Sequence, residues 1–251
     1  AAGARAAAGR ARAIATAAGR DPGEPVLVEA FVPGPEVAVE ALLYDGVVEP
    51  LVVFDKPDPL DGPFFEETIY VAPSRLGAEA EASIVEQLGA AVTALGLRRG
   101  VVHAELRVPS GRAHVIEVAA RSIGGLCSRA LRFGTGSTLE ELVLRNALGL
   151  PLGGKDREVA AAGVMMIPIP AAGRLVAVQG QDAARAVPLV TDVQITIRPG
   201  GRVVPLPDAD RYLGFVFARG GQAADVEAAL RAAHERLDIE IAPVGAAVAV
   251  P

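Results

Sequence analysis

Two glutamates, Glu105 and Glu117, each stand in an apolar segment, and Arg121 follows the second of them by four residues. A three-residue loop at 110–112 would place the two glutamates directly opposite each other in a hairpin. Carboxylates placed in this way repel each other, and a hard divalent cation that shares its shell with phosphates and water would offset the repulsion. A guanidinium beside them could hold a phosphate or carboxylate oxygen bidentately. The alternative is a surface network in which Arg107 and Arg121 only neutralise the glutamates.

The same register separates the side chains of this hairpin, strands 101–108 and 113–121, by polarity. It pairs His103 with Ala119 and Arg107 with Val115, and side chains alternate across a sheet. A two-residue loop would mix polar and apolar residues on both faces, so the odd-length loop is favoured. The polar face would hold His103, Glu105, Arg107, Glu117 and Arg121, and the apolar face would hold Val102, Ala104, Leu106, Val108, Ile116, Val118 and Ala120, with His114 as its only polar member.

Strands mixed with isolated helices must position this hairpin, a pattern typical of the α+β class rather than of an alternating parallel sheet. Asp45-Gly46 is a strong two-residue hairpin signal, and the Pro/Asp/Gly-rich segment 55–68 predicts a long loop that is functional or mobile. The patterns predict strands over 26–32, 36–44 and 47–54, helices over 78–95, 138–148 and 222–237, and short strands with Gly/Pro turns from 157 onward. The apolar stripes of the first and last of these helices are Ile84, Val85, Leu88, Val92 and Leu95, and Val226, Leu230, Ala233 and Leu237.

The elements group into three expected parts. Residues 1–25 contain an Ala/Arg-rich helix that we interpret as the remainder of an incomplete upstream subdomain. Residues 26–150 form a core, and residues 151–251 form a β-rich C-terminal subdomain that closes on a helix. The boundary is expected near 149–158, where Gly and Pro interrupt the apolar pattern.

Composition excludes several classes of function. The 251 residues are 51% hydrophobic, which is ample for a core, and the net charge of -6 comes with 4% aromatics and no basic stripe, so we expect no nucleic-acid partner. No run approaches the roughly 20 apolar residues that span a bilayer, so we expect no membrane partner. One cysteine, Cys127, rules out an internal disulfide framework and fits a cytoplasmic protein; we interpret it as a packed thiol.

Five segments in order carry a resemblance to a known family: "VLVEAFVPGPEVAVEAL", "FFEETIYVAPSRL", "GVVHAEL", "VIEVAARSIGG" and "YLGFVFARG". Together they span about residues 26 to 237, and they resemble the ATP-grasp carboxylate–amine ligases, which include the amino-acid (dipeptide) ligases. The resemblance implies an antiparallel ATP-grasp sheet flanked by helices, followed by a small β-rich C-terminal subdomain with a closing helix. It also implies ATP and Mg2+ as cofactors, with Mn2+ as an alternative metal.

By the same resemblance, the segment from Glu29 to Glu36 would bind the nucleoside. Ala30 and Val32 would offer backbone groups to the adenine edge, and Glu29 would lie beside its amino group. Glu36 would hold the ribose hydroxyls, since a carboxylate accepts hydrogen bonds from two vicinal hydroxyls.

Glu105 and Glu117 match the metal carboxylates of the family, whereas Ala119 stands where the family usually has a third ligand, an Asn. Arg121 matches the arginine that holds the transferring phosphate or the acyl phosphate, and it is the expected catalytic residue. The expected substrate contacts are Glu67, Tyr70, His103, Gly124 and Gly125. Lys56 beside the Pro/Asp-rich loop is expected to be solvated, and His114 and His234 are expected to be structural.

The implied reaction has two steps: a substrate carboxylate attacks the γ-phosphate of MgATP, and an amine then displaces phosphate from the acyl phosphate. The partners are therefore a small-molecule carboxylate and an amine, and a homodimer is the assembly that we consider. A complete enzyme of this kind also needs an N-terminal domain and a glycine-rich phosphate loop, so we expect the sequence to be a C-terminal portion. Two alternatives remain open, a non-catalytic nucleotide-binding or partner-binding module and a carboxylase-type ATP-grasp domain.

Overall fold

The computed structural model describes residues 2–61, 66–158, 160–208 and 211–243. Backbone contacts divide the chain into two units, Ala1–Val32 and Pro33–Pro251. None of the helices in the described ranges is long and apolar enough to cross a membrane.

The first unit is a helix followed by a segment that contains no strand. Helix α1 (Ala2–Ala17) confirms the helix expected from the Ala/Arg-rich start, and Gly19, with a φ of +86°, lies just beyond its end. The strand expected over 26–32 is wrong, because residues 25–33 have no regular secondary structure. A strand is held by pairing with a neighbour, and among the described residues both edges of the next strand, β1 (Glu36–Tyr44), are occupied by other strands.

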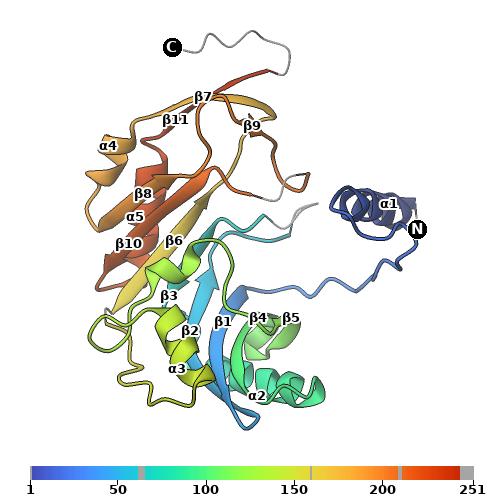
Figure 1. Ribbon diagram of the computed structural model, residues 1–251, viewed down its shortest axis with the longest axis vertical. Helices are drawn as coiled ribbons and strands as arrows, with labels where there is room; N and C mark the ends of the chain where they lie inside the picture. Colours follow the sequence, from blue (N-terminus) through green and yellow to red (C-terminus); the bar gives the residue numbers. More distant parts are fainter. Residues whose placement is uncertain (1, 62–65, 159, 209–210, 244–251) are drawn as a thin grey trace. The chain divides into compact units, whose positions relative to one another are not determined.

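An eight-stranded sheet is the main element of the second unit, and all its pairs are antiparallel (Figure 1). A three-stranded antiparallel sheet accompanies it. The strands of the large sheet, in spatial order, are β5 (His114–Ala119), β4 (Gly100–Arg107), β1, β2 (Val47–Lys56), β3 (Ile69–Ala72), β6 (Ala161–Ile167), β10 (Gly214–Gly220) and β8 (Val190–Ile195). Those of the small sheet are β11 (Asp238–Ala242), β7 (Gly173–Gln179) and β9 (Arg202–Val203).

Helices cover both faces of the large sheet. Helices α2 (Ala78–Ala94) and α5 (Ala223–His234) pack on the face that holds Val37 and Val71, in two apolar clusters. Helix α3 (Leu139–Ala147) and the 3-10 turn η2 (Cys127–Ala130) pack on the opposite face, in a cluster with Ala38 and Tyr70. The polar side chains described below lie on this second face.

The apolar stripe predicted for helix α2 is confirmed at three of its five positions. Ile84, Leu88 and Val92 are fully buried, whereas Val85 is half-buried and Leu95, just past the end of the helix, is 59% exposed. Leu95, the C-cap residue of the helix, therefore does not belong to the core.

The central hairpin keeps the expected pairing of Glu105 with Glu117, but not the expected loop. Strand β4 ends at Arg107 and β5 begins at His114, with the turn η1 (Pro109–Gly111) between them. Arg107 pairs with His114 rather than with Val115, and a β-bulge at Ile116 restores the register at Glu105. Because of the bulge, Ile116 is 42% exposed instead of lying in the apolar cluster, while Val102, Ala104, Leu106 and Val108 are buried as expected.

A second bulge, in the β1–β2 hairpin, changes which residue faces Glu36. The turn at Asp45-Gly46 pairs Tyr44 with Val47 as the sequence predicts, and an extra residue, Leu51, then shifts the register by one. Glu36 therefore lies opposite Lys56, which the unshifted register of the turn would have sent to the other face.

The structure contains three elements that the sequence patterns did not predict: strand β3 in the region before α2, and helix α4 (Gln181–Arg185) and strand β11 in the C-terminal region. Strand β11 follows α5, so the expected closing helix is not the last described element. The large sheet runs through the expected boundary near 149–158, because β6, β10 and β8 continue it beyond β3. The division into 26–150 and 151–251 stays a prediction.

Candidate active site

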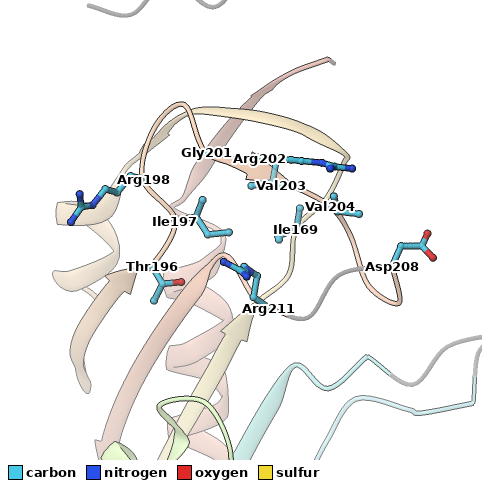
Figure 2. A pocket seen from close by; sticks show the side chains of 10 residues that line it. All are labelled: Ile169, Thr196, Ile197, Arg198, Gly201, Arg202, Val203, Val204, Asp208 and Arg211. Carbon is cyan, nitrogen blue, oxygen red and sulfur yellow. The ribbon is translucent and has the colours of Figure 1, made fainter. Parts of the chain in front are cut away.

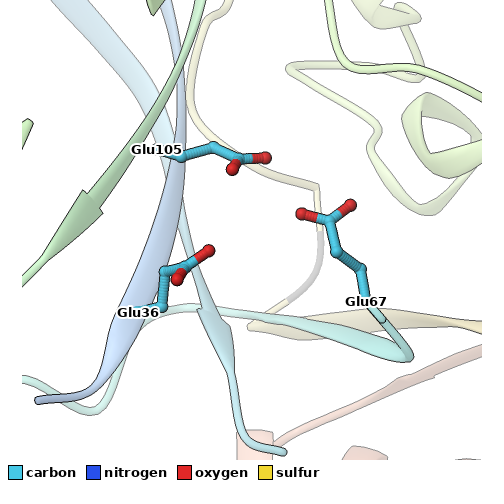
Figure 3. Close-up of side chains that lie close together, drawn as sticks. All are labelled: Glu36, Glu67 and Glu105. Carbon is cyan, nitrogen blue, oxygen red and sulfur yellow. The ribbon is translucent and has the colours of Figure 1, made fainter. Parts of the chain in front are cut away.

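Three carboxylates gather on the α3 face of the sheet. One ligand oxygen each of Glu36, Glu67 and Glu105 lies within 4.8 Å of the others, and Figure 3 shows the three side chains turned toward one another. The ammonium of Lys56 lies between them, 2.8 Å from Glu36 Oε1 and 3.1 Å from Glu105 Oε1, and it also contacts Glu67 Oε1. The acidic cluster is thus held together by one buried cation.

The strands determine this arrangement. Glu36 is the first residue of β1, and Lys56, the last residue of β2, lies directly opposite it. Glu105 lies on β4, and its side chain is on the same face of the sheet as that of Glu36. Arg107 on β4 donates from Nε to Glu36 Oε2 over 2.7 Å, so both oxygens of Glu36 are occupied by cations. Glu67 joins the cluster from the chain segment just before β3.

A buried histidine links this cluster to a fourth carboxylate. His103 contacts Glu40 Oε1 through Nδ1, and its Nε2 lies 3.5 Å from Glu105 Oε1. Burial by itself lowers the pKa of His103, but hydrogen bonds to Glu105 and Glu40 outweigh it and raise that pKa to about 9. Burial likewise tends to raise the pKa of Glu105, but the hydrogen bond from His103 and the charge of Lys56 lower it to about 2. Glu105 is therefore ionised throughout the neutral range.

A cavity of about 170 Å3 opens beside these groups and brings together seven of the predicted site residues. Its other lining is mostly apolar, so the wall of the cavity contains both charged and apolar side chains. The predicted residues in its wall are Glu67, Tyr70, His103, Glu105, Arg121, Gly124 and Gly125, and the residues that the sequence did not predict are Ile123, Cys127, Met166, Tyr212 and Phe215.

Arg121 and the glycines that follow it form the exposed rim of this cavity. Arg121 is exposed, and its Nη1 donates to the carbonyl of Ser122 over 2.9 Å. Gly125 has a φ of +62°, and a Cβ at this position would lie 3.2 Å from the ring of Phe215. The left-handed conformation and the close ring both favour glycine here.

The remaining predicted residues lie elsewhere. Glu117 faces Glu105 across the ladder, but its side chain is exposed on the edge strand β5 and is outside both the carboxylate cluster and the cavity lining. Glu29, Ala30 and Val32 belong to the first unit, whereas Glu36 belongs to the second. The nucleoside role of these four residues and the metal role of Glu117 stay predictions.

The residues fit a divalent cation at Glu105 better than at Glu36. A hard cation takes oxygen ligands, and Glu105 offers an ionised carboxylate that lines the cavity and is 17% exposed at its side chain. Glu36 is buried, and its two oxygens already accept from Lys56 and Arg107.

Other cavities also lie in the second unit. One of about 330 Å3 is lined by Glu36 and Lys56 with the loop 57–60. A larger one of about 630 Å3 lies beside the ends of β8 and β9 (Figure 2), and its lining includes Arg198, Arg202 and Arg211 together with apolar side chains. None of the predicted site residues lines this larger cavity, so its size alone does not make it the functional site.

The sequence-based interpretation missed three charged residues. Lys56 is 6% exposed rather than solvated, Arg107 is buried against Glu36, and Glu40 is fully buried beside His103. The alternation of Glu36 and Glu40 along an apolar strand was a signal for both glutamates. No local signal could have revealed Lys56, because the bulge at Leu51 decides its facing.

Comparisons with known proteins agree with this architecture. Residues 12–130 match the model of the ATP-grasp domain, and residues 165–242 match the model of the L-amino acid ligase C-terminal domain 2.

Several relatives belong to the same group of enzymes. The fold resembles the crystal structure of the L-amino acid ligase from Bacillus licheniformis with a TM-score of 0.75 and 34% identity, over 84% of this chain and 53% of that one. Alanine–anticapsin ligase of Bacillus subtilis is 34% identical over 35% of this chain and 18% of its own length. Carnosine synthase 1 of Gallus gallus is 32% identical over 51% of this chain and 14% of its own length.

The chain spans about half or less of the length of these relatives. The matches nonetheless confirm the resemblance that the five sequence motifs indicated, as well as the α+β fold with an antiparallel ATP-grasp sheet. The chain therefore contains an ATP-grasp domain, which is followed by a C-terminal domain of the L-amino acid ligase type.

Proposed function

We propose that the protein joins a small-molecule carboxylate to an amine at the expense of ATP, through an acyl phosphate. The observation that carries the proposal is the 170 Å3 cavity, because it places the ionised Glu105 and the guanidinium of Arg121 in one wall of an ATP-grasp domain. Groups of this kind stabilise phosphoryl transfer by position and charge, without a protein nucleophile. Cys127, which also lines the cavity, is buried with a pKa raised to about 12 and has no role in the reaction.

Each group has a distinct part in this proposal. Arg121 holds the oxygens of the transferring phosphoryl group, since a guanidinium binds phosphate bidentately. The backbone at Gly124 and Gly125 can approach the same anion closely because neither residue carries a Cβ. The ammonium of Lys56 offsets part of the repulsion among the three carboxylates. Its charge also helps to keep Glu105, which lines the cavity, ionised.

Glu105, with Glu117 as predicted from the family motif, would hold Mg2+. When bound, Mg2+ neutralises charge on the phosphates and orients them. Ala119 supplies no oxygen ligand, so the protein contributes fewer ligands than the family pattern predicts. Mg2+ binds proteins through one or two carboxylates and completes its shell with water and phosphate, so one well-placed Glu105 meets its main need.

We propose amino acids as the substrate class. The cavity lining combines carboxylates and Arg121, which suit an ammonium and a carboxylate, with Met166 and Phe215, which suit an apolar side chain. The names of two relatives, an L-amino acid ligase and an alanine–anticapsin ligase, support this class.

A phosphate-release assay tests the proposal. The purified protein is incubated with MgATP and a panel of amino acids, singly and in pairs, and released phosphate and coupled product are measured. Glu105→Gln and Arg121→Ala should each lower product formation at least about 100-fold, while Arg99→Ala, an exposed arginine 3.7 Å from Asp45, should leave it unchanged. Phosphate release without a C–N product for any pair would refute ligation.

The alternative of a non-catalytic nucleotide-binding module makes a different prediction. It is favoured by Ala119, which removes one expected metal ligand. Calorimetric titration with MgATP would then show binding that Glu105→Gln weakens, in a protein that forms no product with any amine and carboxylate.

A further inference from the structure

Glu40 is a fully buried carboxylate that the proposed reaction does not use. Its side chain is 0% exposed, it lies on β1 between the apolar residues Val39 and Ala41, and it does not line the cavity. Burying a carboxylate is unfavourable unless it is paired. A carboxylate at this buried position therefore needs a partner that stabilises it.

The partner is the imidazole of His103. Glu40 and His103 lie directly opposite each other in the β1–β4 ladder, and Glu40 Oε1 accepts from His103 Nδ1. The second oxygen, Oε2, has no hydrogen-bond partner among the described residues. The main partner of this carboxylate is therefore one ring nitrogen, and the backbone of Ile123 and the charge of Arg121 add weaker stabilisation of its charged form.

The other ring nitrogen faces the site. His103 Nε2 lies 3.5 Å from Glu105 Oε1, and His103 lines the cavity although its side chain is only 5% exposed. An imidazole has two nitrogens at fixed positions on one flat ring, so fixing Nδ1 also fixes the direction of Nε2. Glu40, His103 and Glu105 thus form a chain that runs from the buried interior to the cavity wall.

We propose that Glu40 is a positioning residue for this site: it fixes the His103 ring through Nδ1, so that Nε2 is held toward Glu105 and the cavity. The inference rests on the proposed function only in that Glu105 takes part in the reaction. Glu40 does not line the cavity, and its main contact is His103, so we expect its effect on turnover to pass through His103. Its weaker interaction with the backbone of Ile123, which also lines the cavity, is the competing route that the double variant below tests. Partners of this kind that orient a ligating or contacting histidine typically change activity by about 10–100-fold when removed.

Two substitutions separate positioning from bulk structure. Glu40→Gln keeps the length and a carbonyl oxygen that can accept from Nδ1, and Glu40→Met keeps the length but removes the acceptor. Asn146→Leu serves as the matched control, because Asn146 is also a buried polar residue, 2% exposed, and lies outside the site on α3. We expect Glu40→Met to lower kcat about 10-fold or more, Glu40→Gln to lower it by less than about 3-fold, and Asn146→Leu to leave it unchanged.

NMR of the imidazole N–H protons tests the hydrogen bond of the His103 ring directly and does not depend on enzymatic activity. The chain has 3 histidines, so the imidazole N–H resonances form a simple spectrum in which His103→Gln identifies the signal of His103. The slowly exchanging Nδ1 proton of His103 should be present in the wild type and in Glu40→Gln and absent in Glu40→Met. Persistence of this signal in Glu40→Met, or equal loss of kcat in Glu40→Gln and Glu40→Met, would overturn the proposal. A protein without ligase activity would still give the resonance result, so failure of the proposed function remains distinguishable.

A double variant covers the case in which Glu40→Met does not fold. Replacing both partners leaves no unpaired buried charge, so Glu40→Met combined with His103→Gln is expected to fold. If Glu40 acts through His103, the double variant and His103→Gln alone have the same kcat. A kcat about 10-fold lower in the double variant would show that Glu40 acts by another route and would overturn the proposal.

Discussion

Replacing Lys56 by methionine removes the cation that holds three carboxylates together. The Lys56 side chain is 3% exposed and lies 2.8 Å from Glu36 Oε1 and 3.1 Å from Glu105 Oε1, with Glu67 as its third partner. Methionine has a similar length but no charge, so the carboxylates would repel each other within 4.8 Å in a poorly hydrated place. Breaking a buried ion pair by removing one partner costs about 3–5 kcal/mol, and we expect a loss of that size in the free energy of unfolding.

Urea unfolding at pH 7 measures the loss, with Lys155→Met as the matched control. Lys155 pairs with Glu49, but its side chain is 54% exposed, so its removal should cost less than about 1 kcal/mol. The wild-type advantage over Lys56→Met should shrink as the pH falls, because protonation of the crowded carboxylates relieves their repulsion in the variant. A loss of less than about 1 kcal/mol for Lys56→Met, or a loss equal to that of Lys155→Met, would refute the reasoning.

Three further predictions concern single positions. Burial raises the pKa of the Cys127 thiol to about 12, so the native protein at pH 8 should react with a thiol reagent far more slowly than the unfolded protein; equal rates would contradict this. Gly125 has a φ of +62° and lies beside an aromatic ring, so Gly125→Ala should lower the free energy of unfolding in urea by about 1–2 kcal/mol. Gly89 lies on helix α2, and a Cβ there would lie in open space, so Gly89→Ala should raise the same free energy by up to about 1 kcal/mol. Leu88→Ala should cost about 2–5 kcal/mol because Leu88 is fully buried, and Leu95→Ala, at 59% exposure, should cost less than about 0.5 kcal/mol; similar losses would place Leu95 in the core after all.

Local patterns in the sequence determined the elements whose stability is local. The Asp45-Gly46 turn, the spacing of Ile84, Leu88 and Val92, and Thr138, whose side chain accepts from Glu141 N over 3.2 Å at the start of α3, each follow from interactions within a few residues. The family motifs then located most of the cavity wall, because they follow the strands that carry it.

The tertiary structure decided the facing and the burial of the charged groups. Leu51 and Ile116 each add one residue to a strand, and a one-residue shift moves every following side chain to the other face. The first bulge brings Lys56 opposite Glu36. The exposed edge position of β5 leaves Glu117 outside the cluster, although the expected pairing with Glu105 is present.

The segment 26–32 shows that a local pattern can also fail to predict a whole strand. Its apolar residues have the composition of a strand, but a strand forms only where the fold brings a partner strand beside it, and that depends on the rest of the chain. The sequence by itself thus determined the family resemblance and most of the local elements. Only the tertiary structure decided which charged side chains meet, because long-range register, not local preference, sets the distance between them.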